Sequence, residues 1–284
     1  MMSEKKVRTK RTEDESFLSN ANFPLTRVGT TMHLNCGPND IENRIISVED
    51  SQSARAFSNL LDDSNSTLHI QSGRGFTIYS GEFSGVPVSV ISTGIGSSMM
   101  DFLVREATCF LEGSVAIFRL ASCEVLKSQL DPQAIILNKA SRSIQQNYDY
   151  EPGCGFDPYR ISNPIEADSD LYNVLKEKFE SLTSKVEEGT NISTETFYAC
   201  QGRNDERFSE YNENLISDLM KLEPDALSMD METFKLYHLA SRSKGKIKAV
   251  AALTRANQDK SVLEETQHLS ANAVLQAITS IDLE

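Results

Sequence analysis

The feature that most constrains the fold is a continuous strand–helix–strand pattern between residues 86 and 122. The β-branched run at residues 86–91 predicts a strand. In the segment GIGSSMMDFLVREATCFLEG that follows, apolar residues recur at helical spacing, and Gly113 suits the end of the helix. The next segment, SVAIFRLAS, is almost wholly apolar and predicts a buried strand. This order implies a right-handed crossover onto a largely parallel, buried sheet.

Further segments predict the same mixture of strands and helices. Residues 76–79 predict a strand that turns at Ser84 and Gly85 into the strand at residues 86–91. The stretch IISVEDSQSARAF, residues 45–57, is typical of a strand that runs into a helix. Residues 131–164, where Pro, Gly, Asn and Tyr accumulate, predict long ordered loops. The apolar patterns elsewhere predict helices at residues 169–188, 205–222, 230–243 and 262–281, and a strand at residues 247–253.

The domain organisation predicted from these patterns is simple. The chain shows no internal repeat and no Pro- or Gly-rich linker long enough to divide it. We therefore expect one α/β domain over residues 31–284. Residues 1–30 begin with a charged stretch and are expected to form a flexible N-terminal extension.

Composition excludes several classes of function. The chain carries 41 acidic against 28 basic residues, a net charge of -13, whereas general nucleic-acid binding needs a basic surface. No apolar run approaches the roughly 18 residues of a membrane span, and the N-terminus lacks the apolar core of a signal peptide. The five cysteines are widely spaced without a CxxC pair, which favours reduced thiols over a disulfide frame or a zinc site. We expect a cytoplasmic protein that binds neither nucleic acid nor membrane.

Four separated segments, followed by LTRAN, carry the functional information. They are MHLNCGPNDIENRIISVEDSQSARAF, GRGFTIYSGEFSGVPVSVISTGIGSS, ETFYACQGRNDERF and LSMDMETFKLYHLA. In this order and spacing they resemble the nucleoside phosphorylases, and within them the uridine phosphorylases, from about His33 to the C-terminus. The resemblance implies a single-domain fold with a central mixed, twisted sheet flanked by helices.

The resemblance also implies an activity. It is the reversible phosphorolysis of uridine to uracil and ribose 1-phosphate in pyrimidine salvage, a pentosyltransferase reaction. Inorganic phosphate would be the co-substrate, and no metal or organic cofactor is implied. The expected partners are therefore a small-molecule nucleoside and phosphate, and the expected assembly is a homodimer or a hexamer built from dimers.

The motif FYACQGR carries the predicted base site. The amide of Gln201 and the guanidinium of Arg203 match the edge of a pyrimidine, with its two carbonyls and one N–H. The resemblance implies that these two residues hold uracil and that Phe197 lies beside the ring or the sugar. It also implies that Arg255 supports the base pocket and stabilises the leaving pyrimidine. Without the family, the tripeptide QGR is a common surface sequence and Arg255 a strand-end ion pair.

The motif MDMETF carries the predicted ribose site. A carboxylate can accept hydrogen bonds from two vicinal hydroxyls, and a thioether can cover the apolar face of a sugar. The resemblance assigns these roles to Glu232 and Met231, and it implies that His33 reaches the 5'-hydroxyl across a subunit boundary. Taken alone, Glu232 is an ordinary acid in a first helical turn and His33 a structural residue. The nearby STGIGSS lacks the Lys of a P-loop and is expected to pack a strand tightly against a helix.

The phosphate side matches the family only in part. Arg74 corresponds to an arginine that serves the neighbouring subunit, and Arg119 with Ser122 corresponds to the family's pair on the central strand. The resemblance therefore assigns phosphate to Arg74, Arg119 and Ser122, and it gives Arg119 a role in positioning the nucleophile.

The remaining phosphate positions depart from the family. Where relatives have GDPxR, this chain has EDSQS, so Glu49 replaces a glycine and Ser53 an arginine; farther on, ASCEV places Glu124 at another glycine position. A like charge about 4 Å from an anion costs on the order of 4 kcal/mol at an effective dielectric near 20. The two acids would therefore abolish phosphate affinity unless they turn outward or pair with Arg119 and Arg74.

Two alternatives follow from these departures. One is a catalytically impaired nucleoside-binding or scaffold paralogue, a pseudoenzyme with a degraded phosphate site. The other is a nucleoside hydrolase in which Glu49 acts as a base toward water.

Overall fold

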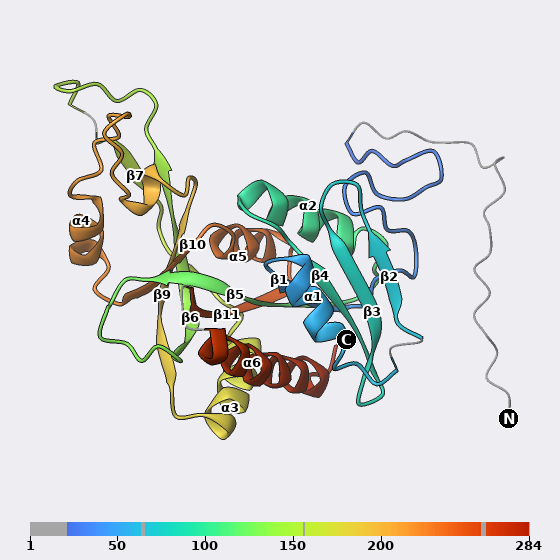
Figure 1. The fold of residues 1–284 in the computed structure, drawn as a ribbon. Helices are drawn as coiled ribbons and strands as arrows, with labels where there is room; N and C mark the ends of the chain where they lie inside the picture. Colours follow the sequence, from blue (N-terminus) through green and yellow to red (C-terminus); the bar gives the residue numbers. More distant parts are fainter. Residues whose placement is uncertain (1–21, 64–65, 156, 257–259, 284) are drawn as a thin grey trace, which may run out of the picture.

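The protein was analysed as a computed structural model that describes residues 22–63, 66–155, 157–256 and 260–283 (Figure 1). Most of the predicted N-terminal extension, residues 1–21, lies outside the described residues. The part of it that is described, from residue 22 onward, forms turns and an isolated bridge between Leu25 and Thr31.

The predicted strand–helix–strand crossover forms as expected. Strand β4 (Val86–Ser92) leads into α2 (Ser97–Thr108) and then into β5 (Val115–Val125). Strand β1 (Arg44–Val48) lies between β4 and β5 and runs parallel to both. The stretch at residues 45–57 is the predicted strand-to-helix junction, because β1 continues into α1 (Ser51–Ser58). The parallel core of the sheet is therefore confirmed.

The strands that complete the sheet are β2 (Leu68–Gln71), β3 (Thr77–Phe83), β6 (Ile135–Gln146), β7 (Tyr159–Ile161), β8 (Ile165–Glu166), β9 (Val186–Thr194), β10 (Ala226–Asp230) and β11 (Ile247–Arg255). In the described residues they join the others in one 11-stranded sheet of order β10-β9-β6-β11-β5-β1-β4-β3-β2, with β7 and β8 paired to β6. Parallel and antiparallel pairs occur together, for example β11 with β5 and β11 with β6. The predicted central mixed sheet is confirmed.

One additional pairing closes part of the sheet into a ring. Strand β10 pairs with β9 in parallel and with β5 in antiparallel, so β5, β11, β6, β9 and β10 form a closed circuit. In this circuit Met229 lies opposite Glu124, and Asp230 lies opposite Ser193. The ends of three strands that are distant in sequence are thereby held together.

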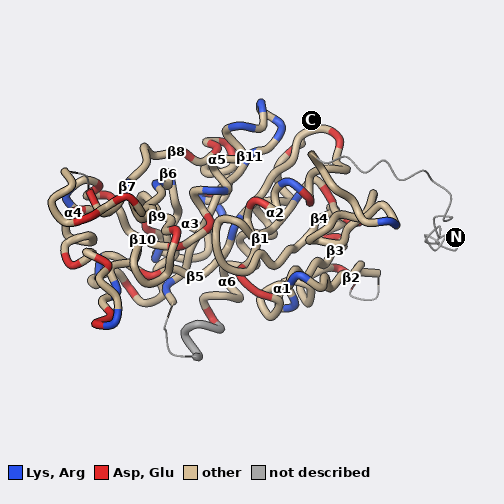
Figure 2. Tube along the Cα trace, turned by 90° about the horizontal axis from the view of Figure 1, so that it is seen from above, with Lys and Arg blue, Asp and Glu red and all other residues tan. Residues whose placement is uncertain are grey.

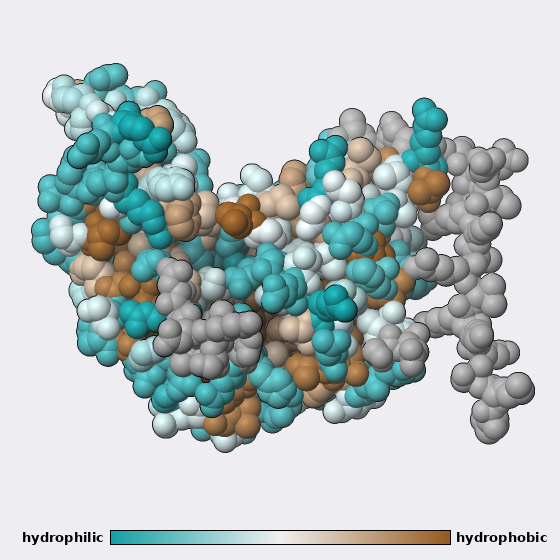
Figure 3. Space-filling model, in the orientation of Figure 1, coloured by the Kyte–Doolittle hydropathy of each residue, from teal (hydrophilic) through white to brown (hydrophobic). Residues whose placement is uncertain are grey.

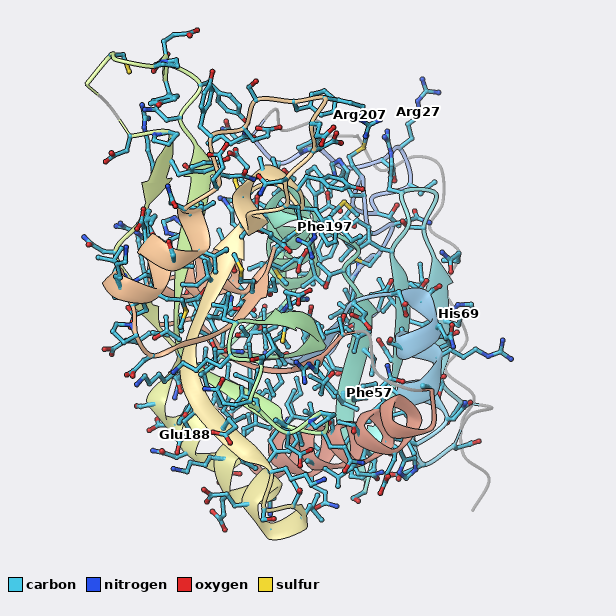
Figure 4. The ribbon with its side chains drawn as sticks, turned by 60° about the vertical axis from the view of Figure 1, so that its left-hand side comes forward. Arg27, Phe57, His69, Glu188, Phe197 and Arg207 are labelled. Carbon is cyan, nitrogen blue, oxygen red and sulfur yellow. The ribbon has the colours of Figure 1, made fainter. Side chains whose placement is uncertain are left out.

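Helices cover both faces of the sheet (Figure 1). The others are α3 (Ser169–Leu182), α4 (Leu215–Leu222), α5 (Thr233–Arg242) and α6 (Lys260–Ser280), with a short 3-10 helix η1 (Ala199–Gln201). Helices α1, α3 and α6 share one hydrophobic core with the sheet, and α2 and α5 share another. Phe57 of α1 belongs to the first core and lies beside α6 in Figure 4.

Four predicted segments are corrected by the structure. The helix predicted at residues 169–188 ends at Leu182, and its last residues belong to β9. The helix predicted at residues 205–222 is helical only in α4, and the helix predicted at residues 230–243 begins at Thr233 because β10 precedes it. The loops predicted for residues 131–164 contain β6 and β7. The predicted strand at residues 247–253 and the helix at 262–281 are confirmed as β11 and α6.

The surface carries charge and apolar groups in a dispersed pattern. Acidic and basic residues are interspersed in Figure 2 and form no continuous basic stripe there. On the face shown in Figure 3, hydrophobic residues form separate patches, and the surface is hollowed between the part around β7 and α4 and the part around α2. Across the described residues, every helix is too short or too polar to span a lipid bilayer. All five cysteines are free thiols.

Candidate active site

A buried arginine lies at the centre of the candidate site. Arg119, in the middle of β5, is 1% exposed. Its Nη2 donates to Glu232 Oε2 at 2.5 Å, and its Nε lies 3.4 Å from Asp230 Oδ2. Its Nη1 is buried without a hydrogen-bond partner. Because buried donors are almost always satisfied, this nitrogen is the one polar atom of Arg119 left to receive a ligand.

Asp230 orients this arginine. Its Oδ1 accepts hydrogen bonds from Asn191 Nδ2 at 2.8 Å and from the Ser193 hydroxyl at 2.6 Å. Its Oδ2 accepts the Thr233 hydroxyl at 2.6 Å. Because both of its oxygens accept hydrogen bonds from neutral donors of β9 and α5, the Asp230 carboxyl group is held in one orientation beside Arg119. Sequence reasoning missed this residue, although it stands two positions before Glu232 in the quoted motif.

Glu232 is the N-cap of α5, and its side chain connects this helix to α2 and β5. The side chain is buried, and its Oε1 accepts the backbone N–H of Gly96, the N-cap of α2, at 2.5 Å. Gly96 has φ 100, a left-handed conformation that favours glycine. Burial raises the pKa of the Glu232 carboxyl above its usual value, the charge of Arg119 opposes the shift, and Asp230 adds to it. The STGIGSS segment thus supplies a strand-to-helix junction beside Glu232, and Met231 lies next to it, half-buried.

The three predicted base residues lie together on the loop after β9. The Cζ atom of Arg203 is 3.8 Å from the centre of the Phe197 ring, and its Nη1 donates to the Phe197 carbonyl at 2.8 Å. The same nitrogen donates to Gln201 Oε1, and Gln201 Nε2 donates to the Thr194 hydroxyl at 2.9 Å. Gly202 turns the chain between them at φ 67. Figure 4 shows Phe197, which is 47% exposed, on this loop.

Glu124 belongs to this base cluster. Its Oε2 lies 3.4 Å from Arg203 Nη2, and both side chains are partly exposed. From the sequence, Glu124 was expected at the phosphate site, where it would turn outward or pair with Arg119 or Arg74. The structure instead places this acid against a residue predicted to bind uracil. A pair this exposed contributes little to stability, so its main effect is on the orientation of Arg203.

Glu49 makes the contact that bears most on the phosphate site. Its Oε2 accepts the backbone N–H of Ser122 at 3.0 Å and the Ser122 hydroxyl at 2.5 Å. Its own carbonyl accepts the N–H of Gly94 at 2.9 Å, which fixes the backbone of the turn. Glu49 therefore neither turns outward nor pairs with Arg119 or Arg74. It occupies both Ser122 donors.

The other departure from the family lies at the start of α1. The Asp50 carboxylate caps this helix by accepting the N–H of Ser53 at 2.7 Å. Ser53 is half-buried and lines a cavity of about 300 Å³. The walls of this cavity come from α1, α6, the ends of β1 and β11 and the middle of β5, and they include Glu49 and Ala121.

Arg255 lies at the end of β11 with its backbone in register with Cys123. Its Nη1 lies 3.5 Å from the carbonyl of Leu130, a weak contact that leaves most of the guanidinium for other partners. Burial raises the pKa of the Cys123 thiol well above its usual value, so this group stays protonated at neutral pH.

Two predicted residues lie apart from the cluster around Arg119. Arg74 is exposed in the turn between β2 and β3. His33 stacks on Phe102 of α2 at 3.7 Å, and its Nδ1 lies 2.5 Å from Glu106 Oε1. Within the described residues, no hydrogen bond or ion pair joins Arg74 or His33 to Arg119 or Glu232.

Glu106 is a further residue that sequence reasoning missed. It is buried on α2, and its Oε2 accepts the backbone N–H groups of His33 at 2.9 Å and Leu34 at 2.8 Å. The signal in the sequence was an acidic residue among the apolar residues of an amphipathic helix. Glu106 fixes both the backbone and the imidazole of His33.

Comparison with known proteins decides the family. The family model described as the phosphorylase superfamily matches residues 43–281. The chain belongs to this superfamily. A solved structure from work on two diverse uridine phosphorylases in the oomycete Phytophthora capsici is 34% identical in sequence to this chain. The match covers 93% of this chain and 99% of the chain in that structure, with a TM-score of 0.88. The fold and the family inferred from the motifs are thereby confirmed.

Two other similar proteins share lower identity with the chain. The uridine phosphorylase of Thermococcus kodakarensis is 28% identical over 229 residues, which is 80% of this chain and 77% of that protein. A Trypanosoma brucei nucleoside phosphorylase whose structure is described as showing uridine phosphorylase activity is 18% identical with a TM-score of 0.76, and it supports the fold alone. This phosphorylase-superfamily chain is therefore most similar to uridine phosphorylases.

Proposed function

We propose that the protein is a pentosyltransferase of the uridine phosphorylase type, which converts uridine and phosphate reversibly into uracil and ribose 1-phosphate. The observation that carries this proposal is the contact of Arg203 with both Gln201 and Phe197 on one loop. An amide and a guanidinium held side by side present the donors and the acceptor that the edge of a uracil requires. The 34% identity with a solved structure from work on uridine phosphorylases adds to the proposal.

The ribose would lie over the buried acid–arginine pair. Glu232 would accept hydrogen bonds from the ribose hydroxyls, and Met231 would cover the apolar face of the sugar. Because Gly96 and Arg119 already hold Glu232, the carboxylate is preorganised for this task.

Phosphate would attack the anomeric carbon as an oxocarbenium-like sugar forms. The unpartnered Nη1 of Arg119 and the donors of Ser122 would position the nucleophile. Negative charge would move onto uracil, where Arg203, Gln201 and Arg255 would stabilise it by preorganised electrostatics. No metal or organic cofactor takes part in this scheme.

The proposed assembly is at least a homodimer, within a hexamer if dimers associate further. Arg74 and His33 lie apart from the Arg119 cluster, which fits a role in the pocket of a neighbouring subunit. The proposed location is the cytoplasm, where uridine and phosphate are both present as small molecules.

The proposal is tested by following the loss of uridine absorbance with and without inorganic phosphate. Turnover that requires phosphate and yields equal amounts of uracil and ribose 1-phosphate is the expected result. Turnover without phosphate would identify a hydrolase, and saturable uridine binding without turnover would identify a nucleoside-binding paralogue. Either result would overturn the proposed function.

A further inference from the structure

One carboxylate of the chain occupies donors that an oxyanion substrate would use. Glu49 Oε2 accepts both the N–H and the O–H of Ser122, at 3.0 and 2.5 Å. A carboxylate oxygen and a phosphate oxygen are the same kind of anionic acceptor for such a pair of donors. Ser122 therefore cannot give both hydrogen bonds to Glu49 and to a phosphate at once.

Two cations of the site form ion pairs with acids other than Glu49. Arg119 contacts Asp230 and Glu232, and Arg203 contacts Glu124. In the described part of the chain, no lysine, arginine or histidine lies within ion-pair distance of Glu49. The side chain is thus held by Ser122 and not by a salt bridge, which makes it exchangeable.

We propose that Glu49 competes with inorganic phosphate for the two donors of Ser122 and so sets the phosphate concentration that the protein requires. This inference rests on the proposed function, because it concerns the co-substrate of the same site. Glu49 is a specificity-determining residue in this scheme, and it acts by occupying a subsite and by repelling a second anion.

The structure also offers a second position for the Glu49 side chain. The backbone of Glu49 is fixed by the hydrogen bond from Gly94, so exchange requires only rotation about side-chain bonds. The cavity of about 300 Å³ borders Glu49, and Gln52, Ser53 and His268 are among the residues that line it. Their amide, hydroxyl and imidazole groups can donate hydrogen bonds to a carboxylate that has left Ser122.

The test is a calorimetric titration of the full-length protein with inorganic phosphate. Glu49→Ala should bind phosphate at least about tenfold more tightly than the native chain, since it removes both the competing acceptor and the like charge. Glu49→Gln should lie between the two, because its amide oxygen still accepts from Ser122 but carries no charge. Uridine affinity should change less than about twofold in both variants, since Ser122 and Glu49 lie on the phosphate side.

Asp50→Asn is the matched control. It removes one negative charge from the adjacent residue, and asparagine still caps α1. Its phosphate affinity should stay within about twofold of the native value, because Asp50 does not contact Ser122. An increase equal to that of Glu49→Ala would show a general charge effect and overturn the competition.

A second variant identifies the contested donor. If Glu49 and phosphate share Ser122, the affinity gained by Glu49→Ala should largely disappear in the Glu49→Ala, Ser122→Ala double variant. A gain that survives without the Ser122 hydroxyl, or no gain in either Glu49 variant, would overturn the inference. The titration needs no turnover, so a tenfold gain without phosphorolysis would support the competition and refute the proposed function.

Discussion

Arg119 Nη2 and Glu232 Oε2 lie 2.5 Å apart, and both side chains are buried. The two residues are 113 positions apart in sequence and are brought together by the closure of β10 onto β5. A buried ion pair of this kind seldom adds much net stability, because desolvation offsets the attraction. Its value here lies in position: it holds a carboxylate and a guanidinium where a sugar and an anion would meet.

Glu232→Gln should make stability less dependent on pH. Burial raises the pKa of Glu232, so above its usual value of 4.5 the folded chain binds this proton more tightly than the unfolded chain does. Native stability should therefore fall as pH rises from about 4.5 to the raised pKa, and level off above it. The free energy of unfolding of Glu232→Gln, minus that of the native chain, should increase across this window in urea titrations. A difference that stays constant or decreases would contradict the assignment.

Arg203→Lys should impair catalysis without unfolding the protein. Lysine keeps the charge but loses the planar fork that contacts Gln201, Phe197 and Glu124. We expect kcat/KM for uridine to fall roughly 10- to 100-fold, which corresponds to about 1.5–3 kcal/mol for a charge-assisted hydrogen bond. Arg207→Lys is the matched control, since Arg207 is exposed and pairs only with Asp205 in the described residues. Equal losses in the two variants would exclude a specific role for Arg203.

Glu106→Gln should reduce the discrimination between uridine and 5'-deoxyuridine. If His33 contacts the 5'-hydroxyl, loosening its imidazole and backbone should weaken that one hydrogen bond, worth about 1 kcal/mol. The ratio of kcat/KM for uridine to kcat/KM for 5'-deoxyuridine measures the effect. His33→Ala should abolish the preference for uridine altogether. Asp101→Asn, a change at a half-buried residue of the same helix that pairs with Arg105, should leave this preference unchanged. A uniform loss on both substrates would indicate a purely structural role for Glu106.

Arg74 and Arg119 should complement each other across subunits. When Arg74→Ala and Arg119→Ala chains are co-expressed, each mixed dimer would contain one pocket with both arginines. About a quarter of native activity should return if dimers form at random. Co-expressed Arg74→Ala and His33→Ala chains should show no such recovery, since both residues would serve the neighbouring pocket. No recovery in the first mixture would show that Arg74 acts within its own subunit, whereas recovery in both mixtures would show that His33 does.

The sequence predicts the crossover from β4 to β5 because both strands are apolar runs and α2 has a regular apolar face. It fails for β6, β9 and β10, whose buried faces carry polar side chains. Asn191 and Ser193 on β9 donate to Asp230, and Ser228 on β10 donates to Asn138 on β6. Partners distant in sequence satisfy these groups, so the local pattern resembles a loop or a helix end.

The candidate site shows the same division. The resemblance to the uridine phosphorylases grouped Gln201, Arg203 and Phe197, and the structure places all three on one loop. Glu49 and Glu124 were identified as departures, but the direction of each side chain depends on tertiary contacts. The acidic residue at position 49 is evident from the sequence, whereas its hydrogen bonds to Ser122 are seen only in the structure.

The pairing of β10 with β5 also bears on how the chain folds during synthesis. Arg119 is made more than a hundred residues before the acids that neutralise it, and β10 and β11 close the ring only after most of the chain exists. Contacts of such sequence separation form slowly. The pocket is therefore a late product of folding, and a ribosome-bound chain that ends before β10 holds an arginine it cannot bury.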